Sequence, residues 1–300
     1  MQNNVWPNST VYDIVVVWRY LTMAITETPL RYPGGKSKLY NLVSDIIKKN
    51  FERGTCTYIE PFAGGAGLAL KLLYNGDVGK IILNDFDPAI YSFWYACLYQ
   101  TEELCDMIEQ CEVTLKTWKT QREIFKSRPY GNTLEYGFST LFLNRCNVSG
   151  VLTGGPIGGH QQAGKYLIDA RFNKKTLIEK IKKVSSFSDK IEIYGNDASD
   201  FLQSDIVKDQ IDSLFFNIDP PYVKKGSQLY ENFFSENDHA ILSNIIMQLK
   251  SKWIITYDEA EIIYDLYEDY RKSIIEMPYS AGQTKKGNEL IIYSDNLVVD

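Results

Sequence analysis

The sequence predicts an α/β fold built on a Rossmann-like sheet, and three stretches carry that prediction. Thr55–Ile59 is typical of a short buried strand, and a glycine-rich loop then leads into a helix over Leu68–Tyr74. A second strand, Lys80–Leu83, runs into the acidic residue Asp85. Leu214–Ile218 is an apolar run that two prolines stop, because proline supplies no backbone donor. Strand, glycine-rich loop and helix in this order start a Rossmann-like unit, whose ligands bind at the carboxyl ends of the strands.

The remaining elements follow from the same patterns. Asp87 before Pro88 is a good helix start, and we expect one helix over Asp87–Met107. A lysine-rich helix is expected over Thr176–Val184 and another after Ser235. The other predicted strands are Ile191–Gly195, Trp253–Tyr257 and a terminal hairpin of Ser273–Met277 with Glu289–Tyr293.

Composition excludes several classes of protein. The chain has 300 residues and is 44% hydrophobic, so it can bury a sizeable core. Its five cysteines form no CxxC pair and it has two histidines, which argues against a metal site or a disulfide framework and favours a reducing cytosol. No apolar stretch reaches the ~18 residues that a membrane span needs. We therefore expect a cytoplasmic protein without membrane contact or bound metal.

Charge is unevenly distributed along the chain. The net charge is −6, yet Lys116–Lys190 contains 14 Lys and Arg against 5 Asp and Glu. A basic segment within an acidic body indicates a face that meets a polyanion. The alternative is a solvated lysine-rich helix, which Lys174–Lys183 could form on its own.

The glycine-rich loop indicates the kind of ligand. Glu60–Gly67 reads E-P-F-A-G-G-A-G, which is neither the dinucleotide nor the P-loop pattern. Such a loop suits a nucleoside with a short charged tail, such as S-adenosylmethionine. Asp85 is placed to accept from ribose hydroxyls, and Lys36, after a glycine pair, could meet a carboxylate or phosphate. Asp197 could accept from an adenine amine or, equally well, cap the following helix.

The tetrapeptide Asp219–Tyr222 (Asp-Pro-Pro-Tyr) is the strongest chemical signal. The carboxylate of Asp219 and the carbonyl of Pro220 can accept the two hydrogens of an exocyclic amine, and the ring of Tyr222 can stack on a planar heterocycle. The alternative is a strand-ending turn with a surface aspartate and a packing tyrosine.

Taken together, the motifs resemble a known family. The order PGGK, EPFAGGAG, NDFDP, NRCN and DPPY, between Leu30 and about Ile292, is similar to that of the Dam-type (D12, α-group) DNA adenine-N6 methyltransferases. The resemblance implies a Rossmann-like S-adenosylmethionine-dependent methyltransferase sheet with a mainly helical inserted target-recognition domain. Residues 1–25 would then be an amino-terminal extension, 26–112 and 190–300 the catalytic domain, and 113–189 the inserted basic domain.

The resemblance also implies site residues and partners. Catalysis would fall to Asp219, Pro220 and Tyr222. The residues expected around S-adenosylmethionine are Tyr32, Lys36, Glu60, Phe62, Gly64, Asp85, Asp197 and Asp219. Those expected to contact double-stranded DNA are Asn144, Arg145, Asn147 and Lys165. The product would be S-adenosylhomocysteine, no metal would be needed, and a restriction or defence partner is possible.

Three other functions remain open at this point. The chain could methylate another planar amine or amide, in RNA or in a protein glutamine, although the basic insert disfavours protein. It could be a catalytically silent DNA-binding module on a methylase fold. A dehydrogenase is disfavoured by the glycine pattern. Analysis of modified nucleosides would separate the first two from DNA methylation.

Overall fold

A computed structural model describes residues 26–31, 36–129, 131, 133–208, 211–223, 234–279 and 285–299. The chain forms two compact units, which we call the amino-terminal and carboxyl-terminal units. The boundary falls between Asn217 and Ile218, and the carboxyl-terminal unit runs on to Leu297. The amino-terminal extension, residues 1–25, lies outside the described residues.

The amino-terminal unit contains a parallel sheet with strand order β3-β2-β1-β4. Its strands are β1 (Thr57–Glu60), β2 (Lys80–Asn84), β3 (Ile191–Tyr194) and β4 (Leu214–Ile218). Thr57 of β1 pairs with Lys80 of β2 on one side and with Leu214 of β4 on the other. Every residue of β1 and β4 is buried, as expected for strands covered on both faces. This order is that of a Rossmann-like sheet, so the predicted α/β fold class is confirmed.

Helices connect these strands and extend the unit. They are α1 (Tyr40–Asn50), α2 (Gly67–Tyr74), α3 (Pro88–Tyr99), α4 (Thr101–Gln110), α5 (Leu115–Ser127), α6 (Thr133–Cys146), α7 (Lys174–Ser185), α8 (Ala198–Gln203) and α9 (Asp205–Lys208). Short 3-10 turns cover Lys36–Leu39 (η2), Val148–Gly150 (η3), Ser188–Lys190 (η4) and Ile211–Ser213 (η5).

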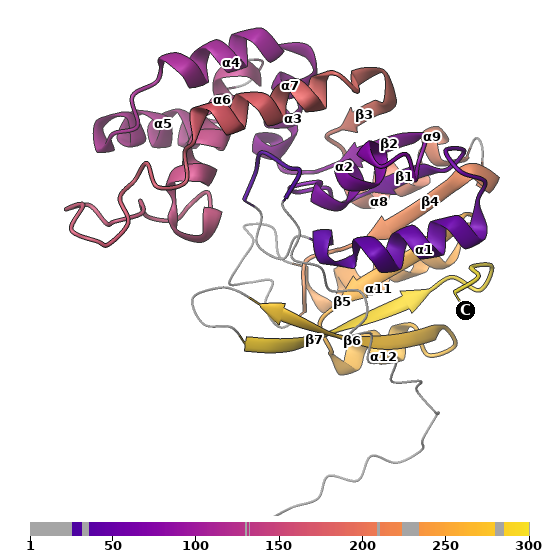
Figure 1. Cartoon of the computed structure of the whole chain (residues 1–300). Coiled ribbons are helices and arrows are strands. Elements are labelled where there is room, and N and C mark those ends of the chain that lie inside the picture. Colours follow the sequence, from indigo (N-terminus) through magenta and orange to yellow (C-terminus); the bar gives the residue numbers. More distant parts are fainter. Residues whose placement is uncertain are drawn as a thin grey trace, which may run out of the picture. The chain divides into compact units, whose positions relative to one another are not determined.

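Helices α3 to α7 pack together as a helical group (Figure 1). Helices α3 and α6 pack closely, since a Cβ on Gly137 would lie 2.6 Å from the backbone oxygen of Ser92. Only glycine permits that contact. The single helix expected over Asp87–Met107 is wrong in one respect: the backbone leaves helical geometry at Gln100 (φ −135°, ψ 39°), which separates α3 from α4. The predicted N-cap is confirmed, since Asp87 accepts from the Ala89 N–H at 2.8 Å.

The carboxyl-terminal unit holds the strands β5 (Lys252–Tyr257), β6 (Arg271–Tyr279) and β7 (Lys285–Tyr293) and the helices α11 (Glu236–Met247) and α12 (Glu261–Leu266). Strand β7 is antiparallel to both β5 and β6. The predicted terminal hairpin is therefore confirmed and is longer than expected. Ser235 begins α11 with a capping box, in which its hydroxyl and the Asp238 carboxylate satisfy each other's backbone N–H groups.

The predicted insert, residues 113–189, contains α5, α6 and α7. Its helices pack on α3 and α4, which come before it in the chain. The boundaries of the insert stay a prediction. Among the described residues, no helix is long and apolar enough to cross a bilayer.

Candidate functional site

Asp85 lies at the carboxyl end of β2, where the sequence predicts a ribose-binding carboxylate. Its Oδ2 accepts from the Gly64 N–H at 2.7 Å, and its Oδ1 accepts from the Asp87 N–H at 3.0 Å. Burial raises the pKa of Asp85 to about 7, and the two backbone donors oppose that rise without cancelling it. The structure thus joins Asp85 and Gly64, two of the predicted cofactor residues, through one hydrogen bond.

The loop between β1 and α2 is held by residues that the sequence analysis missed. Asn84, fully buried, donates to the carbonyls of Pro61 and Asn196, both at 3.0 Å. The indole N–H of Trp94 donates to the Gly64 carbonyl at 2.9 Å. Gly64 itself has a positive φ of 46°, which glycine adopts at little cost. These bonds hold the loop at the carboxyl ends of the strands. They join residues far apart in the chain, so no motif spacing in the sequence indicates them.

The lysine-containing turn and the glycine-rich loop meet at Gly67. A Cβ on Gly67 would lie 2.5 Å from the hydroxyl oxygen of Ser37, so η2 packs closely on the start of α2 and a larger residue would require the Ser37 hydroxyl to move. Lys36, next to Ser37, is buried. Glu60, at the end of β1, is also buried and accepts from the Tyr58 hydroxyl at 2.9 Å. The structure therefore brings two of the predicted motifs together.

Phe62 and Tyr32 are also predicted to bind the cofactor. Phe62 lies in the same loop and is half-buried. Tyr32 lies outside the described residues.

A pocket of about 280 Å³ opens between the ends of β2 and β3. It is lined by Phe86, Pro88, Tyr91, Gly195 and Asn196. Phe86 is 56% exposed, so its ring is accessible to a ligand. Asp85 and Asp197 each lie next to a lining residue in the chain. Aromatic side chains beside two acidic positions could hold a nucleoside, and Phe86 is a candidate site residue that the sequence analysis missed.

Asp197 is exposed and caps α8. Its Oδ1 accepts from the Ser199 N–H at 2.8 Å. The sequence left a cap and an adenine contact equally open, and the structure supplies the cap. The adenine contact stays a prediction.

Asp219 follows β4 directly and belongs to the carboxyl-terminal unit. The hydroxyl of Thr256, which is fully buried on β5, donates to its Oδ1 at 2.8 Å. This bond fixes the orientation of a half-buried carboxylate. Thr256 was not expected from the sequence, where it is one residue of an apolar strand.

The rest of the tetrapeptide is held at two further points. The Tyr222 hydroxyl donates to Oε1 of Glu289 at 2.9 Å, and Glu289 is 1% exposed. The Val223 N–H donates to Oδ1 of Asp258 at 3.0 Å. Pro220, which follows Asp219, is buried. Thr256 on β5, Glu289 on β7 and Asp258, which follows β5, therefore hold the segment from Asp219 to Val223, which a simple surface turn would not require.

His239 is a buried residue of α11 that contacts Tyr257, the residue before Asp258. Its Nδ1 lies 3.0 Å from the Tyr257 hydroxyl, and the side chain is 1% exposed. Burial lowers the pKa of His239. A buried, neutral imidazole bonded to a tyrosine is a packing residue, so we assign it no part in proton transfer.

Asn144 and Asn147, two of the predicted DNA contacts, point into the protein. The Asn144 amide accepts from the Arg31 N–H at 2.7 Å and donates to the Arg31 and Gly150 carbonyls at 2.8 and 3.0 Å. Asn147 accepts from the Trp118 indole at 2.7 Å and donates to the carbonyls of the two residues Val151 and Leu152. Both amides are thus occupied by the chain itself.

Arg145 lies between these two asparagines and is half-buried. Its Nε donates to the Arg171 carbonyl at 2.7 Å. Burial, and then the charge of Arg31, lowers the pKa of Arg145 to about 10. Arg145 therefore remains largely protonated at neutral pH within a small group of arginines, and its contact with DNA stays a prediction.

The basic charge of the insert divides into two parts. On α7, Lys174 contacts the Glu109 carbonyl, Lys180 contacts the Thr26 and Thr28 carbonyls, Lys182 pairs with Glu102 and Lys183 pairs with Glu27. These lysines therefore bond α7 to α4 and to Thr26–Thr28, within the protein itself. Lys165, in contrast, lies on an exposed loop beside Tyr166, whose ring is 57% exposed and lies 5.8 Å from the Lys165 ammonium.

The described residues contain no group of three or more His, Cys, Asp and Glu side chains arranged to hold a metal ion.

The chain is similar to known methyltransferases, in sequence over part of its length and only weakly in structure. Over 116 residues it is 29% identical to the modification methylase StsI of Streptococcus sanguinis, and this stretch is 37% of the chain and 16% of that protein. Among solved structures, two of the rRNA methyltransferase AviRa from Streptomyces viridochromogenes cover 87% of the chain and 85% of their own length. They share 10% and 11% identity with TM-scores of 0.37 and 0.36, too low to support an argument.

The match to a family is much more extensive. The sequence model of the D12 class matches residues 32–280, which includes all but the ends of the chain. This protein belongs to the D12 class N6 adenine-specific DNA methyltransferase family.

Proposed function

We propose that this protein transfers the methyl group of S-adenosylmethionine to N6 of an adenine in double-stranded DNA. One observation carries the proposal: the family's Asp-Pro-Pro-Tyr motif is intact, and Asp219 is held by Thr256 at the end of a parallel strand. Ligands of such folds bind at this end of the strands. The protein would act in the cytoplasm, where DNA is accessible.

The cofactor would bind in the amino-terminal unit. The pocket beside Phe86 and Tyr91 offers aromatic surface for an adenine ring, and Asp85 offers a carboxylate for ribose hydroxyls. Lys36 is positioned near the glycine-rich loop by the Ser37–Gly67 contact, where it would meet the carboxylate of the methionine tail. When bound, the sulfonium supplies an activated methyl group, so the protein's task is alignment.

Asp219 and Pro220 would orient the target amine. An adenine inside a duplex is not accessible, so it would have to be flipped out, at a cost of a few kcal/mol. The Asp219 carboxylate and the Pro220 carbonyl would accept the two amine hydrogens and draw the nitrogen lone pair out of conjugation. Tyr222 would support the flipped ring, with its hydroxyl held by Glu289. No covalent intermediate with the protein is needed.

The DNA would lie on the insert. Lys165, Tyr166 and Arg171 are near one another, because both cations lie within 6 Å of the Tyr166 ring centre. A positive loop with an exposed aromatic ring can contact phosphates and stack on bases. Arg145 would reach DNA only from its half-buried position, and Asn144 and Asn147 would act by holding the surrounding backbone.

The test compares substrates in parallel. The protein would be incubated with S-adenosylmethionine and either unmethylated genomic DNA or total RNA, and the modified nucleosides would be quantified by mass spectrometry. We expect N6-methyl-2′-deoxyadenosine from DNA and, in RNA, no methylated nucleoside above the level of a control without the protein. Methylation of RNA alone, or of cytosine, would contradict the proposal.

A further inference from the structure

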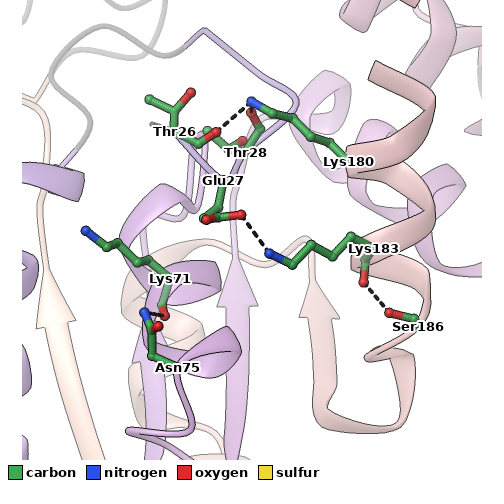
Figure 2. Close-up of polar contacts among 8 residues, drawn as sticks. All are labelled: Thr26, Glu27, Thr28, Lys71, Asn75, Lys180, Lys183 and Ser186. Carbon is green, nitrogen blue, oxygen red and sulfur yellow. Dashed lines mark hydrogen bonds and ion pairs between the residues drawn. The ribbon is translucent and has the colours of Figure 1, made fainter. Parts of the chain in front are cut away.

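A short segment, Thr26–Arg31, lies between the insert and the cofactor loops, and we call it the strap. Two lysines of α7 hold its first half (Figure 2). The Lys180 ammonium donates to the carbonyls of Thr26 and Thr28 at 2.6 and 3.1 Å. The Lys183 ammonium pairs with the Glu27 carboxylate at 2.9 Å.

The end of α6 holds the second half of the strap. The Asn144 amide forms two hydrogen bonds with the backbone of Arg31, one to its N–H and one to its carbonyl. The Arg31 guanidinium in turn donates to the Asn147 carbonyl at 3.1 Å. A Cβ on Gly150 would lie 2.3 Å from the Arg31 carbonyl oxygen, so the two backbones approach as closely as glycine permits. The insert therefore holds the strap at both ends, through Thr26–Thr28 and through Arg31.

The strap also lies beside the start of α2. A methyl carbon of Thr28 lies 3.4 Å from the position that a Cβ on Gly67 would occupy, beside Ser37. At the other end of α2, the Lys183 ammonium lies 4.0 Å from the centre of the Tyr74 ring. The strap thus runs beside the first residue of α2, the lysine that holds Glu27 also packs on the far end of that helix, and Lys36 lies five residues beyond Arg31 in the chain.

We propose that the strap transmits the position of the insert to the cofactor loop, with Lys180 and Asn144 as positioning residues for cofactor binding. This inference rests on the proposed function, because it takes the loop before α2 as the cofactor site. Its basis is that two helices of a predicted DNA-reading insert contribute hydrogen bonds to one segment that runs beside Gly67.

The arrangement links the two ligands of the reaction. If cofactor binding shifts the loop, the strap carries that shift to the insert, and DNA bound to the insert acts on the loop in return. Linkage requires the two effects to be equal, so a factor by which DNA tightens cofactor binding is also the factor by which cofactor tightens DNA binding.

The test uses pairs of variants on the same helices. Lys180→Met removes a strap contact, whereas Lys182→Met removes the same charge two residues away, where the partner is Glu102 and not the strap. Glu27→Gln and Glu102→Gln form a second pair. The dissociation constant of S-adenosylhomocysteine would be measured by calorimetry without DNA, and thermal unfolding would confirm that each variant is folded.

We expect Lys180→Met and Glu27→Gln to weaken binding by about fivefold or more, the usual lower range of coupling between sites. Lys182→Met and Glu102→Gln should bind as the wild type does. Equal affinity in all four variants would overturn the strap inference alone, as would a Lys180→Met variant that loses only DNA affinity. Failure of the wild type itself to bind S-adenosylhomocysteine would instead overturn the proposed cofactor site, and the inference with it.

Discussion

The hydroxyl of Thr256 donates a 2.8 Å hydrogen bond to Oδ1 of Asp219, and both residues lie in the carboxyl-terminal unit. Thr256 is fully buried on β5, so its hydroxyl is held in one place. The bond gives Asp219 a defined orientation at the end of β4. In the proposed reaction, that orientation decides where the target amine lies.

Thr256→Val should therefore slow the chemical step. The substitution keeps the shape of the side chain and removes the donor, which allows the Asp219 carboxylate to rotate. We expect kcat to fall about tenfold, equivalent to ~1.4 kcal/mol of transition-state stabilisation, with both KM values unchanged. Thr256→Ser should restore most of the rate. Wild-type kcat in Thr256→Val would show that the bond has no catalytic role.

Asp85 should make cofactor binding depend on pH. Burial raises its pKa to about 7, and the ionised carboxylate is the better acceptor for ribose hydroxyls. The ionised fraction rises from roughly 10% at pH 6 to roughly 90% at pH 8, so affinity for S-adenosylhomocysteine should rise about tenfold over that range. Asp85→Asn should bind weakly with no pH dependence. Calorimetry at pH 6, 7 and 8 gives the result, and a wild-type affinity that is constant would contradict it.

The loop that carries Lys165 should contribute to DNA binding. Lys165→Ala should weaken binding of duplex DNA and reduce the slope of log affinity against log salt by about 1, as expected for one lost phosphate contact. Tyr166→Ala should weaken binding without changing that slope. Fluorescence anisotropy at several salt concentrations measures both effects. Lys182→Ala is the control, because Lys182 pairs with Glu102; a change of slope there as well would contradict the assignment.

Asn147 should stabilise the protein and not read DNA directly. Its amide satisfies the Trp118 indole and the carbonyls of Val151 and Leu152, all within the amino-terminal unit. Asn147→Ala leaves these buried groups without partners, and we expect the free energy of unfolding to fall by about 1–3 kcal/mol. Urea unfolding measures the change. A variant of normal stability that has lost DNA affinity would instead favour direct contact.

Much of the fold follows from local sequence. The apolar run Leu214–Ile218 before two prolines could only be a strand that stops, and it is β4 with the predicted bounds. Helix starts at Asp87 and Ser235 follow from side chains that satisfy backbone N–H groups nearby in the chain. The break at Gln100 was missed because apolar residues at helical spacing continue beyond it, at Leu104 and Ile108.

The site was less predictable, because its key contacts join residues far apart in the chain. Asn144 and Asn147 look like surface residues in the polar stretch that contains them, but their amides bond to backbone groups that only the folded chain brings near. Thr256 and Glu289 lie in apolar strands, where nothing marks them as partners of Asp219 and Tyr222. The excess of lysines on α7 also suggested a surface for a polyanion, but several of these lysines bond to other parts of the chain.

The central claim is that Asp219 orients an adenine amine for methyl transfer, and a single-turnover experiment tests it most directly. Wild type and Asp219→Ala would each be mixed with labelled S-adenosylmethionine and duplex DNA, and labelled N6-methyl-2′-deoxyadenosine would be followed over time. Binding of the same DNA would be measured in parallel. We predict that Asp219→Ala loses at least about 10²-fold in rate, comparable to removal of a group that acts at the transition state, while it still binds DNA. A variant that transfers methyl groups at nearly the wild-type rate would contradict the account.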